Sequence, residues 1–208
     1  MNKFVRRSVL VAALCVAPAG ATLATVIPAG TASASSAGTL QVNYVVNAST
    51  TLAKLHQTVV VPPGTFKGTI TVPAWTLEGV LALPPASTTV TLAGVGLATA
   101  TFKLAETKPV TGVIDLSTLT VTATSTFNVQ IASVSPLGLP INLVGNKCGT
   151  SKPVSVTFSG KIAFGATSSF SGSYTIPPLS NCGALTPALN LVIPGPGNRF
   201  SATFAPVA

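Results

Sequence analysis

Ionisable side chains are scarce in this 208-residue chain. It has three acidic residues, one histidine and eleven lysine and arginine residues, so that charged residues make up only 7% of it. Catalysis and metal binding usually need acids, histidines or cysteines that lie close together. We therefore predict no metal site and no cofactor. The acids are Glu78, Glu106 and Asp115, and the histidine is His56.

The few acids also argue against an enzyme. Only a hydrolase of an envelope polymer that paired two of Glu78, Glu106 and Asp115 would have enough carboxylates. Glu106 lies between Lys103 and Lys108 and is expected to be a solvated charge. No G-x-S-x-G nucleophile elbow occurs, and the single histidine near a strand start is expected at the surface. We predict that the protein is not an enzyme.

Basic residues outnumber acidic ones but are not clustered. Three of them lie in residues 1–34, which leaves eight against three acids, or a net charge of +5. Nucleic-acid binding usually needs a clustered basic face, so no nucleic-acid partner is expected. The excess favours solubility or loose attraction to an anionic cell wall.

The first 34 residues are built like a secretory signal peptide. A basic start precedes an apolar run over residues 9–26, and small residues follow up to Ala34. This order predicts export, with cleavage between Ala34 and Ser35. An uncleaved anchor is the alternative, because the run is long enough to span a bilayer, but no basic stop-transfer cluster follows it. The protein is expected to be secreted or wall-associated, without a stable membrane span, and both Sec and Tat export stay open.

Two of the three cysteines, Cys148 and Cys182, lie beyond the signal. Cysteines of exported proteins most often pair. A Cys148–Cys182 disulfide would close a loop that stabilises the fold by roughly 4 kcal/mol in the chain-entropy estimate. No histidine or acid lies beside either cysteine, which disfavours a metal or redox pair.

Apolar and polar residues alternate over residues 118–131, which is typical of a strand with one buried face. The remaining segments are short, rich in β-branched residues and punctuated by proline and glycine, with no credible helix. We predict an all-β antiparallel sandwich, with a closed or partly closed barrel as the alternative. The side chains of the 118–131 strand that are expected to face the core are Leu119, Val121, Phe127, Val129 and Ile131.

The domain plan follows from the same pattern. Residues 35–51 are expected to be a flexible N-terminal arm, and residues 52–208 a single β-domain. A strand is expected to end at the Pro62-Pro63-Gly64 sequence. Residues 188–193 and 199–204 are expected to form a hairpin around a Gly-Pro-Gly-Asn turn.

These observations favour a secreted or wall-associated, non-enzymatic β-domain with a structural or interaction role. The alternative is a carrier or binding module for an apolar ligand or a neutral glycan, in which low-charge strands line a cavity. Trp75 is the candidate stacking platform for a sugar.

Several short motifs of the second half occur in a fixed order: residues 138–146, the two cysteines, residues 174–178, and Gly195-Pro196-Gly197-Asn198. Over roughly residues 110–206 this order resembles a group of secreted actinobacterial two-cysteine β-rich proteins of unknown function. The resemblance implies export and a two-cysteine β-domain. It implies no activity, ligand or catalytic residue.

Overall fold

The computed structural model describes residues 38–92, 96–163 and 165–207. The expected signal peptide and the expected cleavage site between Ala34 and Ser35 lie outside these residues. Strands make up 69% of these described residues and helices 6%. The elements in chain order are β1 (Gly38–Leu52), β2 (Gln57–Val72), β3 (Thr76–Ala82), β4 (Ala86–Leu92), β5 (Gly96–Asp115), β6 (Thr120–Pro136), β7 (Gly149–Thr150), β8 (Val154–Lys161), β9 (Ser168–Ile176), β10 (Leu179–Ser180), a 3₁₀ turn (Gly183–Leu185), α1 (Thr186–Val192) and β11 (Gly195–Pro206).

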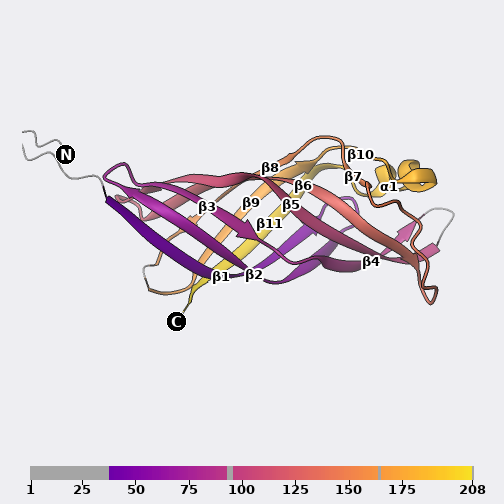
Figure 1. Ribbon diagram of the computed structural model, residues 1–208, viewed down its shortest axis with the longest axis horizontal. Helices are drawn as coiled ribbons and strands as arrows, with labels where there is room; N and C mark the ends of the chain where they lie inside the picture. The colour runs from indigo at the N-terminus through magenta and orange to yellow at the C-terminus, as the bar shows by residue number, and fades with distance from the viewer. Residues whose placement is uncertain (1–37, 93–95, 164, 208) are drawn as a thin grey trace, which may run out of the picture. The chain divides into compact units, whose positions relative to one another are not determined.

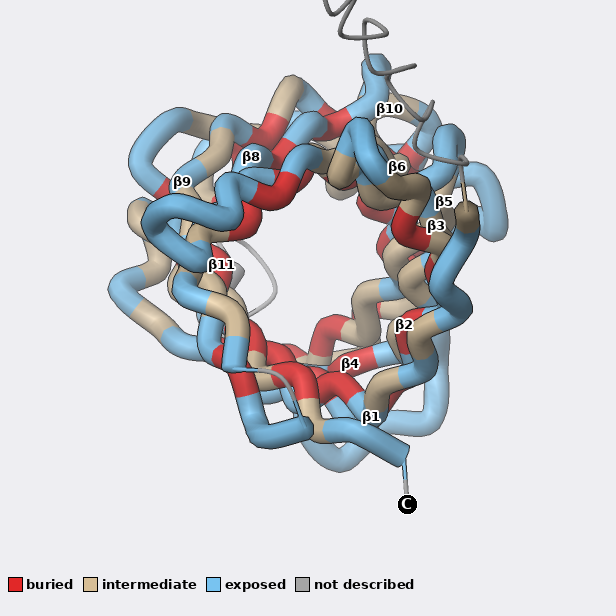
Figure 2. Tube along the Cα trace, turned by 90° about the vertical axis from the view of Figure 1, so that its left-hand side faces the viewer, coloured by how far each residue is buried: buried red, intermediate tan, exposed pale blue. Residues whose placement is uncertain are grey.

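Eight of these strands form a closed antiparallel barrel, in the order β1-β2-β3-β5-β6-β8-β9-β11 and back to β1 (Figures 1 and 2). The fold is therefore the barrel that the sequence left as the alternative, and not the sandwich. Closure depends on β5 and β6, which pair along most of their length, and on β11, which pairs with β1 from Arg199 to Pro206. These two seams join sheets that would otherwise keep free edges.

Prolines inside the long strands sit at irregular positions of the ladder. Pro62 and Pro63 lie opposite Asn47 where the β1–β2 register shifts, and they extend beyond the residues of β2 that pair with β3. Pro109 lies in a second register shift, between β5 and β6. A bulge leaves a residue without a ladder hydrogen bond, and proline has no N–H to lose. The expected strand end at Pro62 is wrong for this reason.

Side chains of β6 alternate between the lumen and the outer surface, as the sequence predicted. Val121, Val129 and Ile131 are buried, and Phe127 is partly buried. Leu119 is an error of the prediction: it is 44% exposed and its φ is 53°, because it belongs to the turn that precedes β6.

The expected flexible arm is wrong over its described part. Residues from Gly38 onward belong to β1, which pairs with β2 on one side and β11 on the other. Val46 and Ala48 on this strand are buried in the core. The low hydrophobicity of the segment reflects its outward-facing polar residues, which alternate with these apolar ones.

The expected C-terminal hairpin is also wrong, because its first half is the helix α1. Pro187 lies in the first turn, where the missing N–H costs no hydrogen bond and the fixed φ suits a helix. Leu189 and Ile193 are fully buried on one side of this segment. The Gly-Pro-Gly-Asn sequence forms the start of β11, with a register shift between Gly195 and Asn198.

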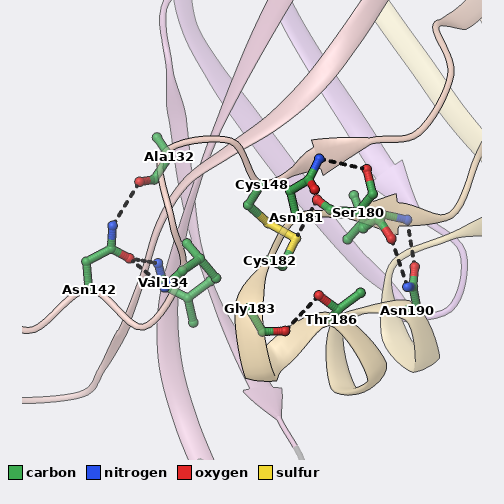
Figure 3. The surroundings of a disulfide bond; sticks show 12 residues. Ala132, Val134, Asn142, Cys148, Ser180, Asn181, Cys182, Gly183, Thr186 and Asn190 are labelled. Carbon is green, nitrogen blue, oxygen red and sulfur yellow. Dashed lines mark hydrogen bonds between the residues drawn. A yellow bond between two sulfur atoms is a disulfide. The ribbon is translucent and has the colours of Figure 1, made fainter.

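The disulfide predicted from the sequence is confirmed. It joins Cys148 to Cys182 and ties the segment after β6 to the segment that leads into α1 (Figure 3). Asn190 of α1 accepts from the Leu179 N–H at 2.7 Å and donates to the Leu179 carbonyl at 3.0 Å. Asn142 accepts from the Val134 N–H at 3.1 Å. We call these segments, residues 137–150 and 179–193, the disulfide cap.

Candidate ligand-binding lumen

Three small chambers lie inside the barrel. The far chamber, with a volume of about 40 Å³, is bordered by Val42, Ile70 and Ile114 among others. The middle chamber has about 20 Å³. The helix-side chamber, with about 50 Å³, is bordered by Ile176 and by Ile193, which directly follows α1. Nearly all the lining side chains are aliphatic or aromatic, so the lumen is apolar.

Shared side chains place the chambers one after another along the lumen. Leu81 and Phe158 border both the far and the middle chamber, and Leu104 borders both the middle and the helix-side chamber. The divisions between the three volumes are therefore side chains rather than backbone. Side chains can change rotamer, so the three volumes can join into one narrow channel.

Several large side chains that face the lumen remain only partly buried. Protein cores are normally close-packed, with few voids larger than a water molecule. Here the interior has unfilled space along its length. The partly buried lumen residues are Val42, Tyr44, Leu77, Leu81, Leu83, Phe102, Leu104, Phe127, Ile162, Phe170 and Tyr174.

Glu106 brings a carboxylate to the middle chamber. Pairing between β3 and β5 stops at Gly79 and Val110, so the next stretch of β3 lacks a strand partner on this side. The Leu81 N–H donates instead to Glu106 Oε1 at 3.3 Å. Burial raises the pKa of Glu106, and the hydrogen bond from Leu81 opposes this in part. Glu106 is therefore not the fully solvated charge that its lysine neighbours suggested.

Ser125 of β6 also borders the middle chamber. The residue is only 4% exposed. Among the described residues no buried side-chain oxygen or nitrogen lacks a hydrogen-bond partner, and the Ser125 hydroxyl brings one donor and an acceptor to the chamber wall.

Tyr174 and Thr50 are the polar pair of the helix-side chamber. Their hydroxyl oxygens lie 2.5 Å apart, and Thr50 Oγ1 donates to the Arg199 carbonyl at 3.0 Å. Because that bond uses the threonine proton, the tyrosine donates to Thr50. Burial raises the pKa of Tyr174, and the bond to Thr50 opposes it. The phenol is thus neutral and keeps a free acceptor lone pair.

Glu106→Gln should stabilise the protein at neutral pH more than at acidic pH. A raised folded-state pKa means that the ionised carboxylate costs stability above that pKa, and that the cost disappears as pH falls below the unfolded-state value near 4.5. Glutamine is neutral throughout and can still accept from Leu81. We expect the gain in melting temperature to be larger at pH 7.5 than at pH 4.5.

The matched control is Glu78→Gln on the outer face of β3. Asp115 does not disturb the comparison between pH 4.5 and pH 7.5. Side-chain hydrogen bonds from Ser117 and Thr118 lower the pKa of Asp115, so its contribution to stability is lost only at more acidic pH. An equal gain at both pH values would contradict burial of the Glu106 charge.

The three acids do not meet. Glu78 is exposed on the outer face of β3, Glu106 faces the lumen, and Asp115 is exposed at the end of β5, where it accepts from the Ser117 hydroxyl at 2.6 Å. His56 is exposed in the β1–β2 turn. Within the described residues no three His, Cys, Asp or Glu side chains gather as metal ligands would.

Trp75 lies in the turn between β2 and β3, where its φ is 51°. Its side chain is partly buried and packs against the core. Its carbonyl accepts from the Ile114 N–H at 2.8 Å, which ties the turn to β5. Two shallow hollows lie elsewhere on the outer wall: one of about 310 Å³ is lined mainly by short polar side chains, and one of about 260 Å³ by longer polar and charged side chains together with glycine.

Sequence reasoning missed the polar residues of the lumen, although the alternation of inward and outward positions along the strands indicates them. Glu106 has the same parity as Phe102 and Leu104, which face inward. Ser125 is the one polar position in the inward series of β6 that includes Val121 and Val129. A polar residue at an inward position of a barrel strand is the pattern that finds such groups.

Over the ranges 38–92, 96–163 and 165–207, no helix is long and apolar enough to cross a membrane. A scan against protein-family models and searches of curated proteins and of solved structures found no match.

Proposed function

We propose that this protein is an exported, non-enzymatic binding protein that holds a slender apolar ligand inside its barrel. The observation that carries this is the row of apolar chambers in the lumen, where a purely structural β-domain would have a close-packed core. Barrels of eight strands have an interior just wide enough for side chains or for one small ligand.

Chamber size limits the ligand. Drug-sized ligands usually occupy pockets of about 300–1,000 Å³, and the spaces found here are far smaller. A single alkyl chain is narrow enough to thread between the lumen side chains if those that divide the chambers change rotamer. A bulky ring system would need the wall itself to move.

Export is the second part of the proposal. The order of basic, apolar and small residues in the first 34 positions supports it. The Cys148–Cys182 bond also supports it, since disulfides persist in oxidising compartments.

The chamber hypothesis predicts that filling the lumen blocks binding. Val61 is 7% exposed and borders the helix-side chamber, whereas its neighbour Val60 is 72% exposed on the outer wall. Val61→Phe should abolish or strongly weaken binding of the neutral apolar dye N-phenyl-1-naphthylamine, followed by its fluorescence. Val60→Phe should leave binding unchanged. Its added ring points to solvent.

Native mass spectrometry of protein from its own culture supernatant supplies the second readout. A co-purifying lipid mass that disappears in Val61→Phe is expected. Overpacking costs about 1–3 kcal/mol, so both variants are compared by thermal melting first. Absence of dye binding by the wild type would favour the structural role instead, and equal dye binding by both variants would place the dye outside the helix-side chamber.

A further inference from the structure

The middle chamber holds two polar groups in otherwise apolar surroundings. Glu106 and Ser125 border it from β5 and β6, and leucine, valine and phenylalanine side chains complete its wall. The two groups come from strands that pair with each other. No hydrogen bond joins their side chains, although each lies against the same small volume.

The chemistry of the two groups is complementary. An ionised carboxylate only accepts hydrogen bonds, whereas a serine hydroxyl both donates and accepts. Glu106 uses one oxygen on the Leu81 N–H, which leaves acceptor capacity towards the chamber. Ser125 is 4% exposed and lines the same chamber, so its hydroxyl can donate to a ligand there.

A group that fits between them must donate to the carboxylate, and it can either accept from the hydroxyl or donate to it. An ammonium can donate to both, but it would lose its hydration in this apolar lumen. An alcohol donates and accepts with one atom. A carboxylate ligand would meet the charge of Glu106, and no Lys, Arg or His borders the chamber to compensate it. A ketone or an ether could accept from Ser125 but would leave Glu106 unused. An alkane would leave both groups unpaired.

The neighbouring chambers fix where the hydroxyl lies in the ligand. The far chamber adjoins the middle one at Leu81 and Phe158, and the helix-side chamber adjoins it at Leu104. Both extend the apolar lumen in opposite directions. A ligand whose hydroxyl occupies the middle chamber therefore places an apolar arm on each side.

We propose that the middle chamber is a subsite for the hydroxyl of a secondary aliphatic alcohol, which donates to Glu106 and accepts from Ser125. The inference rests on the proposed function, because it names the ligand class of the same lumen. Recognition of this kind rejects the analogue that lacks the hydroxyl, since the polar groups of the site are then left unpaired.

The test uses the full oxidised chain at pH 8, with N-phenyl-1-naphthylamine as the displaced dye. Three ligands of equal length are compared: undecan-6-ol, undecan-6-one and undecane. The alcohol should displace the dye at roughly tenfold lower concentration than the ketone or the alkane, which is the size expected for one or two buried hydrogen bonds. Undecan-6-amine should bind no better than the alcohol.

Ser125→Ala and Glu106→Gln separate the two contacts. Ser125→Ala should remove most of the advantage of the alcohol over undecane, and Glu106→Gln should reduce it several-fold. Undecane should bind Ser125→Ala at least as tightly as it binds the wild type, because the alkane then leaves one polar group fewer unpaired, and this shows that the lumen is intact. The matched controls are Ser159→Ala and Glu78→Gln, both at exposed outer positions.

The possible failures are distinguishable. If undecane binds but the alcohol binds no better, the chamber holds only water and the subsite is overturned while the proposed function stands. The same holds if the advantage of the alcohol survives both variants, or if the amine binds more tightly. If neither the dye nor any of the ligands binds, the proposed function fails, and the subsite fails with it.

Discussion

Phe204→Ala should lower the free energy of unfolding by about 3–5 kcal/mol, the range for deleting a buried aromatic ring. Phe204 is 7% exposed, and its ring packs edge-on against Tyr44, Phe66 and Phe170 with centroids 6.1, 5.7 and 5.1 Å away. These four rings come from β1, β2, β9 and β11, so they join four strands across the closing seam of the barrel. Edge-on aromatic pairs stabilise the fold beyond the contribution from burying their apolar surface area.

Urea unfolding of the variant, analysed by linear extrapolation, measures the loss. Thr203→Ala, one residue away on the outward-facing side of β11, should cost no more than about 0.5 kcal/mol. A loss below about 1 kcal/mol for Phe204→Ala would show that the ring cluster is loosely packed.

Reduction of the Cys148–Cys182 bond should lower stability by roughly 4 kcal/mol, from a loop with a sequence separation of 34. For a domain of this size, that corresponds to about 10 °C in melting temperature. Both cysteines are at most 1% exposed, so full reduction should require partial unfolding. The double variant Cys148→Ala with Cys182→Ala should reproduce the loss without reductant.

The location of the loss is as informative as its size. The bond anchors the disulfide cap, so amide exchange should increase in residues 137–150 and 179–193 before it increases in β1 or β2. Mass spectrometry of the exported protein should show no free thiol before reduction. Two free thiols, or an unchanged melting temperature after reduction, would contradict a stabilising bond.

Local pattern predicted local structure well in this chain. The alternation over β6 identified Val121, Val129 and Ile131 as buried, because a strand with one covered face has period two. The cysteine count identified the disulfide, because only two cysteines follow the apolar N-terminal run.

What the pattern missed depends on contacts between distant residues. A sandwich and a barrel use the same alternating strands, and only the β1–β11 and β5–β6 pairings distinguish them. Pro62 and Pro63 predicted a strand end, but a bulge absorbs both residues. Residues 188–193 are apolar and β-branched enough for a strand, but Pro187 in the first turn and the burial of Leu189 favour the helix α1.

The lumen could be predicted from the sequence only in part. The sequence prediction placed Glu106 in solvent and did not single out Ser125, although both occupy inward positions of their strands. The volumes of the chambers depend on how side chains from eight strands fill a shared space, which no single segment encodes. That is why the sequence left both a dry core and a cavity open.

The pairing of β1 with β11 also constrains how the chain folds. Ser49 of β1 lies opposite Ser201 of β11, so barrel closure joins residues about 150 positions apart. Until β11 arrives, one edge of β1 has unpaired backbone groups and the lumen is open to solvent. Contacts of such long sequence separation slow folding, and an exposed strand edge invites pairing with other chains. The pairing of β11 thus sets both when the barrel closes and how long the edge of β1 remains prone to aggregation.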